Sequence, residues 1–205
     1  MSIKNNSALI VVDYQIDFVD GSFAIKNSND IVCNINNLID KFNIVAYTKD
    51  NHPSDHITFI NSKHLENLTT MLDPLTNKYK GQFPIHCVEN TLGNQFHKSL
   101  KLKVLENESN IFKKGTKTFV EEFSGFKNPD LNNFLTKNMV VNVYTVGLAY
   151  DYCVGETALD SSMLGYNTYI VKDCCKSIDK NSEKEMEKKL INANVKIINY
   201  DDIII

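Results

Sequence analysis

The most informative segment of the chain reads Val146-Gly147-Leu148-Ala149-Tyr150-Asp151-Tyr152-Cys153-Val154-Gly155-Glu156-Thr157-Ala158-Leu159. A mostly apolar run over 139–146 precedes it, so the pattern predicts a strand, a turn that begins with glycine, and a helix over 154–164. Cys153 stands at the predicted start of that helix, where unpaired N–H groups and the helix dipole favour a thiolate. Because the thiolate is the nucleophilic form of cysteine, Cys153 is a candidate nucleophile.

Outward from this segment, strand and helix patterns alternate. Short apolar runs predict strands over 8–12, 44–48, 110–113, 168–171 and 195–198, and apolar residues at helical spacing predict helices over 28–42 and 182–193, with another beginning at Pro129. Alternation with short connections predicts an open, mostly parallel α/β sheet with helices on both faces, a three-layer α/β/α arrangement. Residues 51–91 interrupt this pattern with a long irregular segment, which inside a compact domain is more often functional than idle.

Composition limits the class of protein. The chain has 205 residues, of which 42% are hydrophobic and 23% charged, as expected for a single globular domain over 1–205. The net charge of −3 offers no basic surface, so we expect no nucleic-acid partner. No apolar run is long enough to span a bilayer, and the polar start 1–7 lacks the core of a signal peptide, so we expect a cytoplasmic protein without a membrane partner. The odd count of 5 cysteines favours reduced thiols.

Charged side chains follow the ends of several predicted strands. In open α/β sheets the ligand lies beyond the carboxyl ends of the strands, and Asp13, Asp50, Lys114 and Cys153 stand at or just past such ends. A buried Asp13 would have a raised pKa and could take the thiol proton, although a turn cap is the commoner role for a lone aspartate there. A lysine beside the thiolate would lower the thiol pKa, but the local pattern does not distinguish Lys113 from Lys114.

Asp50 and the histidines form a candidate metal site. Residues two apart in an extended chain point the same way, so Asp50 and His52 could share one ion with His86, which follows the irregular segment. One carboxylate and two imidazoles suit a divalent first-row metal with open positions. Cys87 could serve as a soft ligand, although a buried apolar role is commoner for cysteine. His56, His64 and His97 are interpreted as surface residues.

Four aromatic residues are candidate walls for a flat aromatic ligand, namely Phe18, Phe83, Phe123 and Tyr152. Each of them taken singly is more typical of a hydrophobic core. Their interpretation as a binding site therefore depends on whether the fold brings them together.

Taken in order, the motifs resemble the isochorismatase-like cysteine hydrolase superfamily, and within it the nicotinamidases. The matching segments are 11–18 (VVDYQIDF), 48–56 (TKDNHPSDH), 83–88 (FPIHCV) with Thr91 and Gly93, 114–115 (KG) with 123–126 (FSGF), and 147–154 (GLAYDYCV). The chain departs from the family at Asn51 and Phe83, where tryptophan is frequent, and at Asn90, where glycine is frequent. These departures affect the pocket wall and one loop.

The resemblance implies a catalytic triad of Asp13, Lys114 and Cys153, and it favours Lys114 over Lys113 because the family's lysine precedes a glycine. It also implies a metal ion, with zinc as the first choice and iron or manganese as alternatives. The ligands would be Asp50, His52 and His86, with Asn61 as an additional candidate. The family further carries a cis peptide bond before the residue that matches Ala149, which would direct the N–H groups of Ala149 and Cys153 to an oxyanion hole.

The activity that the resemblance implies is hydrolysis of nicotinamide to nicotinate and ammonia through a thioester on Cys153, as part of NAD salvage. The ring nitrogen would bind the metal, and the ring would lie between Phe18, Phe83 and Phe123. The expected partner is a small-molecule substrate, and self-association into a homo-oligomer is left open. The alternatives are an amidase for another small heteroaromatic amide and a non-catalytic protein that binds a pyridine metabolite. The intact triad disfavours the second, and the absence of a CxxC pair disfavours a thiol redox or structural zinc protein.

Overall fold

Strand β1 (Ser7–Val12) lies inside the sheet, and all six of its residues are buried. The computed structural model describes residues 6–59 and 83–203, and within them six parallel strands form one sheet in the order β3-β2-β1-β4-β5-β6. The other strands are β2 (Ile44–Asp50), β3 (Ile111–Lys114), β4 (Asn142–Leu148), β5 (Asn167–Lys176) and β6 (Lys196–Ile198). The predicted parallel α/β sheet is confirmed.

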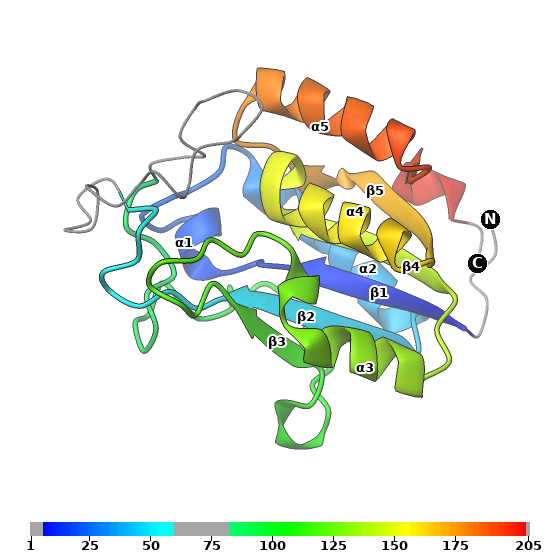
Figure 1. The fold of residues 1–205 in the computed structure, drawn as a ribbon, viewed down its shortest axis with the longest axis horizontal. Helices are drawn as coiled ribbons and strands as arrows, with labels where there is room; N and C mark the ends of the chain where they lie inside the picture. Colours follow the sequence, from blue (N-terminus) through cyan, green and yellow to red (C-terminus); the bar gives the residue numbers. More distant parts are fainter. Residues whose placement is uncertain (1–5, 60–82, 204–205) are drawn as a thin grey trace.

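Alternate residues of β1 pack against helices on opposite faces of the sheet. Leu9 and Val11 belong to a core that includes the buried face of α2 (Val32–Lys41). Ala8, Ile10 and Val12 belong to a second core, shared with α3 (Pro129–Lys137), α4 (Gly155–Met163) and α5 (Lys180–Asn192). Figure 1 shows the resulting layers, with α2 behind the sheet and α3 and α4 in front of it. This burial on both faces explains why β1 is apolar along its whole length.

Several element boundaries differ from those predicted. The predicted helix over 28–42 is a 3₁₀ turn, η1 (Ser28–Ile31), followed by α2. The predicted start of a strand at Met139 is wrong, because Met139 is 79% exposed with φ 53° in the turn after α3. Strand β5 continues past the predicted 171 to Lys176, since its polar end still pairs with β4. The short helix α1 (Ile16–Val19) was not predicted, because four residues show no helical period.

Gly147 lies where the order of strands reverses. Strand β1 has β2 on one side and β4 on the other, and such a switch point opens a crevice at the carboxyl ends of the strands. Gly147 pairs with Val12 at this point and has φ +117°, and an added Cβ would lie 2.1 Å from the carbonyl oxygen of Val12. A side chain at position 147 would therefore push β4 away from β1.

Among the helices of the described residues, none combines the length and the apolar character needed to cross a membrane. The longest α-helix in 6–59 and 83–203 is α5, which carries charged residues along much of its length.

Gly147→Ala should destabilise the protein strongly. We expect it to lower the free energy of unfolding by roughly 4 kcal/mol or more, because a backbone clash adds to the unfavourable φ. Gly165→Ala is the matched control, since Gly165 also has a positive φ (+92°) but no atom within 4 Å of the added Cβ. Its cost should be about 1–3 kcal/mol. Denaturant unfolding measures both, and equal losses would contradict the role given to the β1–β4 contact.

Candidate functional site

Lys114 joins the carboxyl ends of the central strands. Its Nζ atom lies 2.8 Å from Oδ2 of Asp13, 2.5 Å from Oδ1 of Asp50 and 3.2 Å from Sγ of Cys153. These partners come from the residue after β1, the end of β2, and the π-helical turn η5 (Tyr150–Val154) after β4. The structure thus brings together the four side chains that the sequence placed at one rim of the sheet.

Strand register explains why the lysine is Lys114. Asp50 and Lys114 are direct partners in the parallel pairing of β2 with β3, so their side chains leave the sheet on the same side. Lys113 is exposed, whereas Lys114 is buried. Burial alone would lower the pKa of Lys114, but the charges of Asp13 and Asp50 outweigh it and raise the pKa well above its ordinary value. Lys114 is therefore a permanent cation among these groups.

Asp13 is held in an unusual backbone conformation, with φ 47°. The Thr48 hydroxyl donates a 2.6 Å hydrogen bond to Oδ1, whereas Oδ2 contacts Lys114 Nζ as an ion pair without hydrogen-bond geometry to any described residue. Burial raises the pKa of Asp13, and the charge of Lys114 offsets this only in part. Oδ2, whose only close partner among the described residues is the Lys114 ammonium, is thus the oxygen that can accept a proton, and the raised pKa agrees with the place of Asp13 after an apolar strand.

The thiol of Cys153 is less acidic than its sequence position indicated. The side chain lies in the π-helical turn ahead of α4, and burial raises the pKa of the thiol well above its ordinary value despite the nearby charge of Lys114. The start of the helix therefore does not by itself yield a thiolate. A carboxylate oxygen of Asp13 lies within 4.8 Å of Sγ, close enough for the carboxylate to serve as the missing base.

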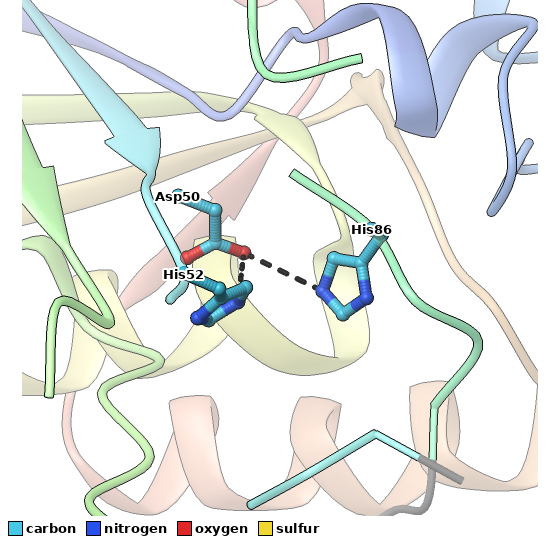
Figure 2. A group of neighbouring side chains, drawn as sticks. All are labelled: Asp50, His52 and His86. Atoms are coloured by element: carbon cyan, nitrogen blue, oxygen red, sulfur yellow. Dashed lines mark ion pairs between the residues drawn. The ribbon is translucent and has the colours of Figure 1, made fainter. Parts of the chain in front are cut away.

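Asp50, His52 and His86 converge on a common point. The Nε2 atoms of His52 and His86 lie 3.5 and 3.9 Å from Oδ2 of Asp50, and Figure 2 shows both rings facing that oxygen. All three side chains are buried. Burial would raise the pKa of Asp50, but the charges of Lys114 and His52 hold it below its ordinary value, so the carboxylate is ionised.

The two imidazoles are oriented as metal ligands usually are. Nδ1 of His52 lies 2.9 Å from the carbonyl oxygen of Gly115, and Nδ1 of His86 lies 2.7 Å from that of Pro84. A carbonyl oxygen can only accept, so each Nδ1 is the donor, and each Nε2 is the nitrogen that faces Asp50 and would bind a metal ion in the neutral ring. An added Cβ on Gly115, at φ +65°, would lie 2.4 Å from Cε1 of His52, so glycine is required there. The donor set fits a divalent cation of the borderline type.

A hydrogen-bond network that the sequence did not reveal supports these ligands. The amide of Gln15 donates to the Asp50 carbonyl (2.9 Å) and accepts from the Asp50 N–H (2.8 Å). Asn94 donates to the carbonyls of Asp50 (2.7 Å) and Cys87 (2.9 Å), and Asp17 accepts from the Cys87 N–H (2.7 Å). The end of β2 and the loop after His86 are thereby bound to each other. Gln15 and Asp17 lie in the matched segment 11–18, but nothing in the sequence indicates their partners.

The four predicted aromatic residues line one pocket together with the metal-site residues, Ala149 and Cys153. Phe83 and Phe123 lie 5.5 and 5.4 Å from Tyr152, measured between ring centroids. Phe18 lies 5.2 Å from the ring of His86. They come from four separate segments of the chain, which is why no single segment could establish their proximity.

Three further residues of this pocket were not predicted, namely Phe23, Glu121 and Ile178. Phe23 packs 5.4 Å from Phe83 and 5.1 Å from His86, again between centroids. Burial raises the pKa of Glu121 to about 7. A glutamate in a charged segment and an isoleucine in a loop carry no sequence signal for a pocket.

The structure places the remaining histidines and Cys87 outside the candidate metal site wherever it describes them. His56 and His97 are buried, not surface residues, and both ring nitrogens of each lie within hydrogen-bond distance of neighbouring protein atoms. Cys87 is buried and belongs to neither group of described residues that could hold a metal. Asn61 and His64 lie outside the described residues.

The Leu148–Ala149 peptide bond is cis, as the resemblance implied. The Ala149 carbonyl accepts the N–H groups of Tyr152 (3.1 Å) and Val154 (3.0 Å), which closes the π-helical turn. Ala149 and Cys153 therefore lie on the same wall of the pocket. Such π turns occur frequently at functional sites.

Comparison with known proteins agrees with this geometry. The isochorismatase domain family matches residues 7–202. A nicotinamidase of Acinetobacter baylyi is 34% identical over 215 residues, which cover 100% of this chain and 98% of the relative. The structure of an Acinetobacter baumanii nicotinamidase and pyrazinamidase superposes with a TM-score of 0.83 at 30% identity, covering 97% of this chain and 98% of the other. The structure of a Pyrococcus horikoshii pyrazinamidase in complex with zinc superposes with a TM-score of 0.77 at 32% identity, covering 95% of this chain and 99% of the other. This chain belongs to the isochorismatase family.

Proposed function

We propose that this protein is a metal-dependent amidohydrolase that converts nicotinamide and water to nicotinate and ammonia. The observation that carries the proposal is the meeting of Asp13, Lys114 and Cys153 beside the Asp50, His52 and His86 group in one aromatic pocket. The nicotinamidases and pyrazinamidases among its full-length relatives support the same substrate class. The reaction would return nicotinamide to NAD synthesis.

We assign one divalent metal ion to Asp50, His52 and His86. Zinc is the first choice, with iron or manganese as alternatives, and the relative from P. horikoshii was solved with zinc. When bound, the ion would supply a Lewis acid that orients the ring nitrogen of the substrate and polarises the ring. The carbonyl partners of both Nδ1 atoms support this assignment, because they leave Nε2 of each ring facing Asp50.

In the first half-reaction, Asp13 acts as the base. Its carboxylate takes the proton of the Cys153 thiol, and the Lys114 ammonium stabilises the thiolate that forms 3.2 Å away. The thiolate attacks the amide carbon, and the oxyanion is bound by the N–H groups of Ala149 and Cys153. Asp13 then gives its proton to the amide nitrogen as the carbon–nitrogen bond breaks. Ammonia leaves, and a thioester on Cys153 remains.

In the second half-reaction, the roles reverse. Asp13 takes a proton from water as the oxygen attacks the thioester carbon. The carbon–sulfur bond then breaks, and the proton held by Asp13 returns to the sulfur. The nicotinic acid that forms loses its remaining acid proton to solvent and leaves as nicotinate. The raised pKa values of Asp13 and of the Cys153 thiol suit this transfer of a proton between them, because neither group strongly favours its ionised form.

The pocket wall favours a flat ring. Phe18 and Phe83 are buried, Phe123 and Tyr152 are half-buried, and all four line the pocket with aromatic rings. A second candidate function, hydrolysis of another small heteroaromatic amide such as pyrazinamide, rests on the same wall, which selects for ring shape more than for ring identity. The buried Asp13 carboxylate with its raised pKa, beside Cys153, disfavours a non-catalytic binding protein, which needs no proton acceptor there.

We further propose that residues 1–205 form one domain that acts in the cytoplasm on a small molecule. The family match over residues 7–202 supports a single domain. The net charge of −3 supports the absence of a nucleic-acid partner. A homo-oligomer stays a prediction that sedimentation velocity can test.

Ammonia release from nicotinamide, measured together with metal content, tests the function directly. We expect turnover of nicotinamide and pyrazinamide and little turnover of aliphatic amides, because aliphatic amides offer no ring for the aromatic wall or the metal. Efficient release from aliphatic amides alone would contradict the proposal.

Cys153→Ala should abolish turnover, with a loss of at least about 10⁴-fold, because the nucleophile is removed. Cys33→Ala is the control, since Cys33 is an exposed thiol outside the pocket, and it should keep normal activity. Asp13→Asn should lose most turnover while still binding substrate. If Cys153→Ala released ammonia at a near-normal rate, the thioester mechanism would be wrong.

His52→Ala should lose bound metal and weaken substrate binding. His97→Ala is the matched control, because His97 is also buried and hydrogen-bonded but contacts Asp20 and Ser99 instead of Asp50. Metal content measured by elemental analysis should fall in the first variant and stay at the wild-type level in the second. Full metal occupancy in His52→Ala would refute the ligand assignment.

Asn94→Ala should weaken metal affinity by roughly 10–100-fold, the range observed when groups supporting metal ligands are removed. The reason is that the variant loses the two hydrogen bonds by which the Asn94 amide links the carbonyl oxygens of Asp50 and Cys87. Asn36→Ala is the matched control, because the Asn36 amide likewise links two segments, α2 and residues 99–101, but lies away from the site. It should leave metal affinity unchanged. Competition with a chelator measures both, and equal affinities would show that the network does not support the ligands.

A further inference from the structure

A second cleft lies next to the catalytic loop. Its volume is about 520 Å³, and its walls come from the end of β5, the start of α5, the turn at residues 26–27, and Tyr150 of η5. This volume falls in the range of about 300–1,000 Å³ that is typical of small-molecule sites. None of the proposed catalytic or metal-binding residues lines it.

The cleft is lined by more positive than negative charge. Four lysines line it, Lys26, Lys172, Lys176 and Lys180, against the two acids Asp179 and Glu183. Lys172 and Lys180 are paired with glutamates of α5, and Asp179 caps that helix by accepting the N–H groups of residues 181 and 182. Lys26 and Lys176, by contrast, form no ion pair with any residue in 6–59 or 83–203. Two ammonium groups are thus available to an anion.

The wall of the cleft also holds an unpartnered hydroxyl group. Tyr150 is 1% exposed, and its hydroxyl has no hydrogen-bond partner among the described residues. Burial raises the pKa of Tyr150 well above its ordinary value, with smaller contributions from Glu187, Cys175 and Glu183, so the group stays a donor. Lys172, which also lines the cleft, lies with Nζ 5.8 Å from the centroid of the Tyr150 ring. A buried donor without an acceptor is unfavourable until a ligand supplies one.

We propose that this cleft binds a phosphorylated metabolite of up to nucleotide size. Lys26 and Lys176 contribute point charges to the phosphate, and the Tyr150 hydroxyl donates a hydrogen bond to one of its oxygens. A phosphate matches this set better than an uncharged ligand, because it accepts from several donors at once. The volume of the cleft leaves room for the organic group that carries the phosphate.

The cleft and the substrate pocket are neighbours with a shared wall. Ile178 lines both, and the Asp151 carboxylate holds it in place by accepting the N–H groups of Ile178 and Asp179, each at 3.0 Å. The same π-helical turn contributes Tyr150 to the cleft and Cys153 to the pocket. The proposed ligand therefore binds beside the substrate and leaves the substrate pocket free.

The test is a calorimetric titration of the metal-loaded protein with AMP and with inorganic phosphate, and with adenosine as the uncharged control. We expect both phosphates to bind and adenosine not to bind. Lys26→Gln/Lys176→Gln should weaken AMP binding at least tenfold. Lys184→Gln/Lys188→Gln, which makes the same change of charge on exposed residues of α5 outside the cleft, should bind AMP as the wild type does.

Two further variants distinguish binding in this cleft from binding at the metal site. Tyr150→Phe should weaken AMP binding severalfold and, without ligand, should not lower the melting temperature, because no hydrogen bond is lost. His52→Ala should keep the affinity for AMP, since the metal site is not involved. The proposal is overturned by equal losses in both double lysine variants, by loss of AMP binding in His52→Ala, by a lower melting temperature in Tyr150→Phe, or by no phosphate binding at millimolar concentration.

Discussion

The buried ammonium of Lys114 is the interaction on which the site depends. It contacts the carboxylates of Asp13 and Asp50 and the sulfur of Cys153, and all four groups are removed from water. A buried ion pair is retained only where geometry and hydrogen bonds compensate its desolvation, and loss of one partner typically costs about 3–5 kcal/mol. One cation thus serves two centres. Through Asp13 it reaches the proposed base, and through Asp50 it reaches the proposed metal site, so neither centre can be assembled without the other.

The sheet determines where the side chains of the site lie, and the loops determine how they are aligned with one another. Parallel register places Asp50 beside Lys114, and the switch point between β1 and β4 opens the space that Asp13 and Cys153 enter. His86 lies in none of the six strands of the described sheet. The segment that follows it is attached to the end of β2 by backbone hydrogen bonds of His52 with Cys87 and Glu89 and by side-chain amides such as Asn94. Both types of support hold the side chains of the site in fixed relative positions.

Residues at strand ends were the ones that the sequence could identify. Asp13 and Asp50 follow apolar runs whose strand character is unambiguous, and parallel strands bring such ends to one edge. Glu121 and Phe23 could not be found in this way, because they lie in irregular segments whose course depends on contacts distant in sequence. The acidity of Cys153 was misjudged for a related reason. The local pattern reports the start of the helix, whereas the pKa of the thiol depends on how completely the surrounding chain buries it.

The sequence alone determined the parallel α/β class, the order of the motifs and the kinds of side chain that converge, because hydrophobic period and strand ends are local properties. Resemblance to a family then selected Lys114 over Lys113. Only the tertiary structure decided which oxygen of Asp13 can accept a proton, how His52 and His86 are oriented, and which residues form the walls of the two clefts. Those features arise where loops that follow different strands meet. Burial, hydrogen-bond direction and charge at such points depend on residues that lie far apart in the sequence.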